Sequence, residues 1–140
     1  KESVYLRSQS SESYPSLSPD GRWLAYSSNE NSRFEIYVQS YPVPGTKYQV
    51  TTGGGNGPRW SPDGRELFYV TLDLFLTAVP VTPGESLEFG APQRLFALPS
   101  YTDFEPAADN QRILAPARAN SSAAEAITIV QEWSAGLAQE

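Results

Sequence analysis

The sequence has no cysteine and no histidine among its 140 residues. Without cysteine there is no disulfide, no thiolate nucleophile and no cysteine-based zinc site. Without histidine the chain lacks the commonest general base and metal ligand, and with it the usual Ser-His-Asp and Cys-His catalytic arrangements. These absences argue against a conventional hydrolase. We therefore expect a protein that is not an enzyme and that holds no metal ion and no cofactor.

Basic residues and long apolar runs are also scarce. Ten Lys and Arg stand against sixteen Asp and Glu, which gives a net charge of −6, whereas a nucleic-acid-binding protein normally presents a basic patch. No apolar run approaches the roughly 20 residues that a membrane helix needs. We therefore expect no nucleic-acid partner and no insertion into a membrane. The hydrophobic fraction of 39% is that of a globular domain.

What the sequence does contain is an internal repeat. Residues 14–26 and 57–69 carry the same amino acid at eight of thirteen positions, at an offset of 43 residues. A weaker third copy begins near Asp103. Repeats of about 40–50 residues that each hold four short strands are typical of the blades of a β-propeller.

Each copy of the repeat contains a tight turn. An Asp-Gly pair between two apolar-patterned runs is the strongest short signal of a hairpin. In the third copy asparagine, which also tolerates a positive φ, replaces the glycine. We assign these pairs a structural role, because an Asp side chain can accept hydrogen bonds from nearby backbone N–H groups. The pairs are Asp20-Gly21, Asp63-Gly64 and Asp109-Asn110.

The repeat predicts an all-β fold, a β-propeller with three blades of four antiparallel strands in each chain. The blades cover residues 14–56, 57–102 and 103–140. The third blade lacks its outer strand, whereas residues 1–13 contain a spare strand at Val4–Arg7. The predicted strands within the blades are 14–18, 23–28, 35–41, 47–52, 57–61, 66–71, 74–81, 93–98, 103–107, 112–118 and 126–133.

Three blades cannot close a ring, because propellers typically have four to eight. We therefore expect a homodimer in which each chain supplies half of a six-bladed propeller. Residues 4–8 of one chain would pair beside residues 126–133 of the other and complete its third blade. This pairing would also remove exposed strand edges, which invite aggregation. The alternative is that the chain is an excised piece of a larger propeller.

A family resemblance rests on residues 18–22 and 61–65, which both read Ser-Pro-Asp-Gly-Arg, and on the segment 127–133. The sequence resembles the TolB-type, WD-repeat-like propellers of bacteria, above all the C-terminal blades of propellers attached to bacterial serine/threonine kinases. The resemblance implies a sensor or scaffold in the periplasm or elsewhere outside the cytoplasm. It includes no kinase segment, so kinase activity is not carried over.

Loops at one rim of the predicted channel are the expected place for a ligand or partner, because the blades are rigid and loops carry function. Aromatic rings and arginine are favourable at interfaces, and ordinary packing is the alternative role for the same residues. The candidate ligand- or partner-binding residues are Tyr14, Arg33, Phe34, Asn56, Arg59, Tyr101, Asp103 and Phe104.

Two other patterns carry weaker functional signals. Residues 53–57, Gly-Gly-Gly-Asn-Gly, lack the glycine spacing and the following helix of a phosphate-binding loop, so we expect a flexible connection between blades. Several carboxylates in predicted loops could supply a general acid and base, but nothing in the sequence brings two of them together. They are Glu12, Glu30, Glu35, Asp73, Asp103 and Glu105.

The function that fits these features best is a non-catalytic interaction or scaffold module. It would bind a protein, a peptide or a small ligand at one rim of the channel. One alternative is an accessory propeller that gates substrate entry in a larger peptidase, or that accompanies a kinase. Another is a propeller that binds a sugar or a metal ion, whose site would then consist of oxygen ligands alone.

Overall fold

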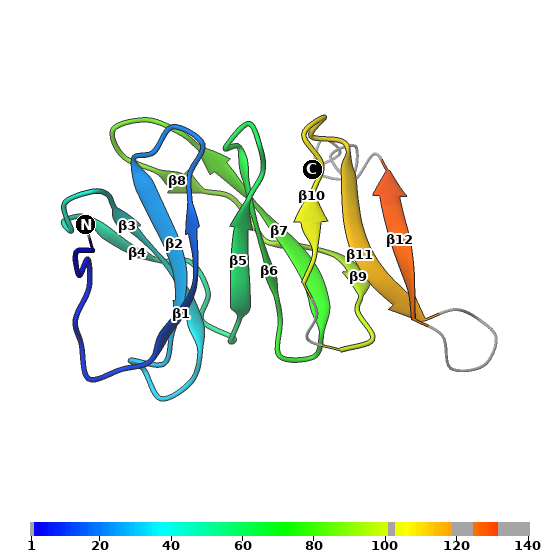
Figure 1. Ribbon diagram of the computed structural model, residues 1–140, viewed down its shortest axis with the longest axis horizontal. Coiled ribbons are helices and arrows are strands. Elements are labelled where there is room, and N and C mark those ends of the chain that lie inside the picture. Colours follow the sequence, from blue (N-terminus) through cyan, green and yellow to red (C-terminus); the bar gives the residue numbers. More distant parts are fainter. Residues whose placement is uncertain (1, 101–102, 119–124, 132–140) are drawn as a thin grey trace.

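The computed structural model describes residues 2–100, 103–118 and 125–131, with the backbone alone described for 117–118 and 125–131. In this part of the chain three antiparallel sheets stand side by side along the long axis of the molecule (Figure 1). In each sheet the strands follow one another in chain order from one edge, apart from an extra pairing in the second sheet. Each sheet is therefore a single blade.

The first blade consists of β1 (Glu12–Leu17), β2 (Trp23–Ser28), β3 (Glu35–Ser40) and β4 (Lys47–Gln49). The second consists of β5 (Asn56–Trp60), β6 (Glu66–Val70), β7 (Phe75–Thr82), β8 (Glu88–Phe89) and β9 (Gln93–Ala97). Strands β8 and β9 both pair with β7, and the short β8 was not predicted. The third blade consists, among the described residues, of β10 (Glu105–Pro106), β11 (Arg112–Arg118) and β12 (Glu125–Gln131).

The turn between the first two strands of a blade is built in the same way in successive copies. The Ser18 carbonyl accepts the Gly21 N–H at 2.8 Å, and Gly21 lies at a φ of 73°, a conformation that glycine adopts readily. Asp20 Oδ1 accepts hydrogen bonds from the Ser18 hydroxyl at 2.6 Å and the Arg22 N–H at 3.1 Å. The bond from Ser18 is the main cause that lowers the pKa of Asp20.

The second and third copies repeat this geometry. Asp63 Oδ1 accepts from the Ser61 hydroxyl and the Arg65 N–H, at 2.7 and 3.0 Å. In the third copy Asp109 Oδ1 accepts the N–H of Gln111 at 3.0 Å, and Asn110 takes the glycine position at a φ of 54°. The turn therefore survives the loss of glycine.

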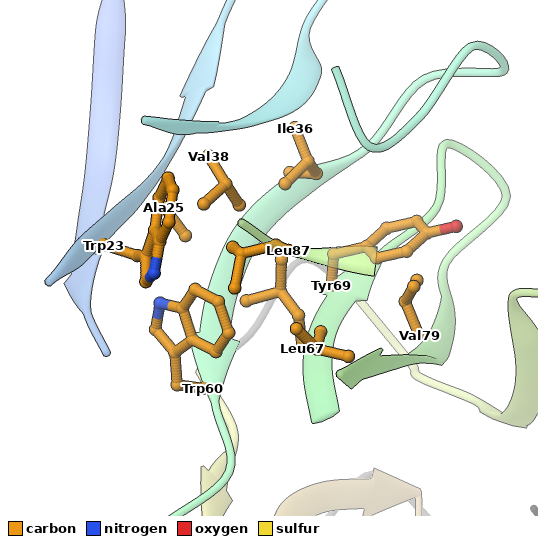
Figure 2. Close-up of a cluster of buried hydrophobic side chains, with 10 residues drawn as sticks. Trp23, Ala25, Ile36, Val38, Trp60, Leu67, Tyr69, Val79 and Leu87 are labelled. Carbon is orange, nitrogen blue, oxygen red and sulfur yellow. The ribbon is translucent and has the colours of Figure 1, made fainter. Parts of the chain in front are cut away.

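The blades are joined by two clusters of buried side chains. Successive residues of a strand point to opposite faces, so in β6 Leu67 enters one cluster and Phe68 the other. Figure 2 shows the cluster between the first two blades, where the indole rings of Trp23 and Trp60 lie close together. The second cluster joins the second and third blades and contains Phe68, Val70, Leu76, Ala78, Leu98, Phe104, Ile113 and Ala115.

Two glycines of the connection between the first two blades, Gly54 and Gly55, are buried and hydrogen-bonded, which differs from the flexible loop that we expected. The carboxylate of Glu35 is buried and accepts the Gly54 N–H at 3.1 and 2.9 Å through its two oxygens. The Thr51 hydroxyl donates to the same carboxylate. Gly55 donates its N–H to the Phe34 carbonyl at 3.0 Å. The buried carboxyl group thus organises the loop, because a buried polar group needs hydrogen-bond partners at fixed positions.

The raised pKa of Tyr26, a residue of β2, leads to a prediction for the stability of the fold at alkaline pH. Burial, followed by the charges of Glu30 and Glu12, raises the pKa of Tyr26 from 10.0 to about 12. Above pH 10 the unfolded chain releases this proton before the folded chain does, so folding stability falls as the pH rises through this window. We expect Tyr26→Phe to flatten the fall, as measured by urea unfolding at several pH values between 10 and 12.

The wild-type chain is the reference for this experiment. Equal slopes for Tyr26→Phe and the wild-type chain across the alkaline range would contradict the assignment to Tyr26.

Candidate functional site

A pocket of about 270 Å³ lies where the first strands of the three blades approach one another. Strand β5 contacts both β1 and β10, so it forms the middle of the wall. The pocket therefore draws on the first strands of blades that are about forty residues apart in the sequence. Its lining residues are Tyr14, Pro15, Ser16, Asn56, Gly57, Pro58, Arg59, Val70, Asp103 and Phe104.

Two equivalent β-bulges shape the pocket. The pairing of β1 with β2 is irregular between Ser13 and Ser16, and Tyr14 there has a φ of 54°. The pairing of β5 with β6 is irregular between Asn56 and Arg59, and Gly57, at the same position of the repeat as Tyr14, has a φ of 63°. A bulge changes the direction of a side chain, and a left-handed non-glycine residue is strained by about 1–2 kcal/mol. The strained residue, Tyr14, is therefore one of the residues that line the pocket.

The charged side of the pocket is formed by Arg59 and Asp103, and Glu105 lies next to it as a second carboxylate beside Arg59. Arg59 Nη1 lies 3.3 Å from Glu105 Oε2, and Arg59 Nη2 lies 3.9 Å from Asp103 Oδ1. The side chains of Arg59, Asp103 and Glu105 are 42%, 92% and 65% exposed. Exposed ion pairs of this kind contribute little to stability. All three groups therefore remain available to a ligand that offers both a hydrogen-bond acceptor and a positive charge.

The apolar side of the pocket is anchored in the protein core. Phe104 is buried and packs edge-to-face on Phe68, with the ring centroids 6.2 Å apart. Pro15, Pro58 and Val70 complete this side. Because the prolines and the buried ring have few rotamers, this wall is rigid and a ligand would lose little affinity to its reordering.

The structure brings together five of the eight candidate binding residues. Tyr14, Asn56, Arg59, Asp103 and Phe104 all line the pocket. Tyr101 lies outside the described residues. Five further residues line the pocket and were not predicted, although the repeat places two of them, Pro15 and Pro58, at equivalent positions. They are Pro15, Ser16, Gly57, Pro58 and Val70. That equivalence was the available signal for an inner wall.

The other two candidates hold the connection between blades and do not line the pocket. Arg33 Nε donates to Glu35 Oε1 at 2.6 Å, and the guanidinium also donates to the Thr52 carbonyl. Phe34 supplies the carbonyl that accepts the Gly55 N–H. Arg33 and Phe34 therefore lie apart from the candidates that line the pocket, because the contacts of Arg33 and Phe34 are with Glu35 and the glycine-rich loop.

Three of the other candidate carboxylates, Glu30, Asp73 and Glu35, have partners of their own. Glu30 forms an ion pair with Lys47 at 2.7 Å. Asp73 Oδ2 lies 2.6 Å from Arg94 Nη2, and the Thr71 hydroxyl is the main cause that lowers the pKa of Asp73. Glu35 is buried against its own hydrogen-bond donors. Among the side chains that the structure describes, no group of three acidic residues is placed to hold a metal ion.

Solved structures share this arrangement of blades. An oligogalacturonate lyase from Vibrio parahaemolyticus superposes with a TM-score of 0.55 at 22% identity, over 71% of this chain and 27% of the other. A candidate TolB protein from Agrobacterium tumefaciens superposes with a TM-score of 0.60 at 18% identity, over 88% of this chain and 46% of the other. Both are β-propellers. The fold of this chain is that of a β-propeller. No protein-family model matches the sequence.

The likeness confirms the predicted all-β propeller fold and says nothing of a ligand at these identities. The chain spans less than half the length of either propeller that it matches. The first strands of propeller blades surround a central channel, so the pocket lies on the channel side. No helix in the described part of the chain is long and apolar enough to cross a membrane.

Proposed function

We propose that this propeller is a non-catalytic binding module that holds a peptide segment of a protein partner in the channel-side pocket. The observation that supports the proposal is the composition of the pocket wall. The wall combines a rigid apolar side, formed by Phe104 and prolines, with the exposed polar groups Arg59 and Asp103, and the exposed Glu105 lies beside Arg59. Pockets with apolar walls and a few placed polar groups are the usual form of a binding site.

The chemistry of the polar groups favours a peptide that carries a basic side chain. Arg59 can donate to a backbone carbonyl, and the amide of Asn56 can both donate and accept. Asp103 in the pocket wall and Glu105 beside Arg59 give this region one more negative than positive charge, which complements a lysine or arginine of the partner. The exposed ring of Tyr14 adds apolar contact area at low entropic cost.

We also propose that this propeller catalyses no reaction. Cysteine and histidine are missing from the sequence. Asp103 and Glu105 are the carboxylates that line or border the pocket, and both lie within ion-pair distance of Arg59. We therefore assign these two carboxylates to ligand binding and not to acid–base chemistry.

Peptide selection on the purified chain tests the proposal. A library of random peptides displayed on phage is selected against the wild-type chain, and the affinity of enriched peptides is measured by fluorescence anisotropy. We expect enriched peptides to contain a basic residue, and Arg59→Ala and Tyr14→Ala each to weaken binding by about tenfold or more, as for residues at the centre of an interface.

The matched control is Arg65→Ala, which removes an exposed arginine of the same blade outside the pocket lining. It should leave the affinity unchanged. The proposal fails if no peptide is enriched, or if Arg59→Ala and Arg65→Ala bind the selected peptides equally well.

An acidic oligosaccharide is the second candidate ligand. One structural neighbour is an oligogalacturonate lyase, and Arg59 and the exposed ring of Tyr14 are groups that could bind and stack on an acidic sugar. The two carboxylates beside Arg59 oppose this ligand, because they repel a uronate. A titration with oligogalacturonate distinguishes the candidates, since saturable binding lost in Arg59→Ala would favour the sugar.

A further inference from the structure

The blades at the two ends of the row each carry an exposed apolar residue on their outward face. At the equivalent positions of the other blades, the residue is buried against a neighbouring blade. Ala25 in β2 and Phe68 in β6 point toward the following blade and are fully buried, whereas Leu114, at the same position in β11, is 38% exposed. Trp60 in β5 packs on the preceding blade and is 8% exposed, whereas Leu17, at the same position in β1, is 47% exposed. Both end faces are therefore of the kind that pairs with another blade.

The N-terminal segment contacts the first blade at the position where the outer strand of a preceding blade would contact it. Tyr5 and Tyr48 occupy the same position of the 43-residue repeat. Tyr48 belongs to the outer strand of the first blade and contacts the second blade after its third strand, with its hydroxyl oxygen 3.1 Å from the Leu87 nitrogen and its ring 5.4 Å from Phe89. The ring of Tyr5 contacts the first blade after its third strand, 5.5 Å from Tyr41.

The segment around Tyr5 nevertheless pairs with no strand. Residues 2–11 form none in a single chain. At the opposite end of the molecule β12 is the last strand of the third blade, and the described residues place no strand beyond it. Figure 1 shows the N-terminal segment beside β3 and β4 and β12 at the far end of the row. Within the described residues, the N-terminal segment and the outer edge of β12 therefore lie at opposite ends of the row.

We infer that a second copy of this chain joins the two ends, so that residues 4–7 of each copy form the outer strand on β12 of the other. Two copies contribute three blades each and close a ring of six, within the usual range for propellers. A two-fold axis makes the two junctions identical, and closed two-fold dimers are the commonest assemblies. The inference does not depend on the proposed ligand.

The repeat also predicts the register of the new pairing. In the first blade Val38 of β3 lies opposite Ala25 of β2 on one side and opposite Tyr48 of β4 on the other. In the third blade Ile129 lies opposite Leu114, which is the counterpart of Ala25. Ile129 in the third blade is therefore at the position equivalent to Val38 in the first blade.

Tyr5 of the other copy takes the place of Tyr48, which puts it opposite Ile129. One step along the antiparallel pair, Leu6 lies opposite Thr128, as Gln49 lies opposite Tyr37 in the first blade.

Because the sequence has no cysteine, engineered cysteines report this register directly. The double variant Leu6→Cys/Thr128→Cys should form a disulfide-linked dimer under mild oxidation, seen on a non-reducing gel. Residues directly opposite in a sheet have Cβ atoms near the separation that a disulfide needs. The matched control is Leu6→Cys/Val130→Cys, whose second cysteine is displaced by about 6.6 Å along the strand. We expect at least a tenfold lower yield of linked dimer from it.

The mass of the unmodified chain in solution is the independent measurement. Light scattering should give twice the chain mass of 15.4 kDa. Leu17→Glu places a charge on an end face, so this variant should contain more monomer than the wild-type chain. Leu72→Glu changes a half-exposed residue of the middle blade and should dimerise as the wild-type chain does. A chain that is monomeric at every concentration, or equal cross-linking by the two cysteine pairs, would overturn the inference.

Discussion

Replacing Phe68 with alanine is expected to lower the free energy of unfolding by about 3–5 kcal/mol, the usual cost of removing a buried phenylalanine side chain. Phe68 is fully buried in β6 and belongs to the cluster that joins the second and third blades. Its ring also packs edge-to-face on Phe104, which lines the pocket. The substitution should therefore weaken the junction between two blades and the support of the pocket together.

Urea unfolding followed by tryptophan fluorescence measures the effect of Phe68→Ala. The matched control is Val43→Ala, at a side chain that is 74% exposed, which should change the free energy of unfolding by no more than about 0.5 kcal/mol. If Phe68→Ala proves too unstable to purify, Phe68→Leu keeps part of the volume and should show an intermediate loss. Equal stability of Phe68→Ala and Val43→Ala would contradict the packing described between the blades.

The second large effect is expected at the glycine-rich connection. A Cβ at Gly55 would lie 2.9 Å from Tyr69 Cδ2 and 3.1 Å from Ile36 Cγ1, and both of these side chains are buried. Because neither can move into solvent, Gly55→Ala should cost about 1–3 kcal/mol of stability, the range for an overpacked core. The loss should appear as a lower urea midpoint with an unchanged slope, since the extent of unfolding stays the same.

Gly53 provides the control from the same run of glycines. A Cβ at Gly53 would meet no atom within 4 Å, and its φ is not in the left-handed region. Gly53→Ala should therefore change stability by no more than about 0.5 kcal/mol. If Gly53→Ala and Gly55→Ala had the same effect, the loop would be as loose as the sequence suggested, and the buried arrangement around Glu35 would be wrong.

The pocket and the proposed dimer concern the same channel. The wall built by β1, β5 and β10 comes from three blades, and a ring of six would place two such walls around one axis. Two equivalent pockets would then face a shared space. A partner protein with two copies of the bound segment would gain avidity from such an arrangement, because the second contact forms at a high effective concentration.

The sequence by itself determined the local elements of this protein. The Asp-Gly and Asp-Asn pairs predict turns because a carboxylate beside a residue with positive φ closes a turn by hydrogen bonds to its own neighbours, as at Asp20 and Asp109. The recurrence of that turn predicted the blades and most of their strands, apart from β8. These features depend on residues close together in the chain, so a pattern of residues is enough to reveal them.

Only the tertiary structure decided which candidate residues meet. Tyr14, Arg59 and Phe104 come together because two clusters of buried side chains fix the angle between blades, and that packing depends on residues far apart in the sequence. Arg33 looked equally suitable, but Glu35 is buried nearby and binds its guanidinium. The burial of one carboxylate cannot be read from residue types, because it follows from how the whole chain packs.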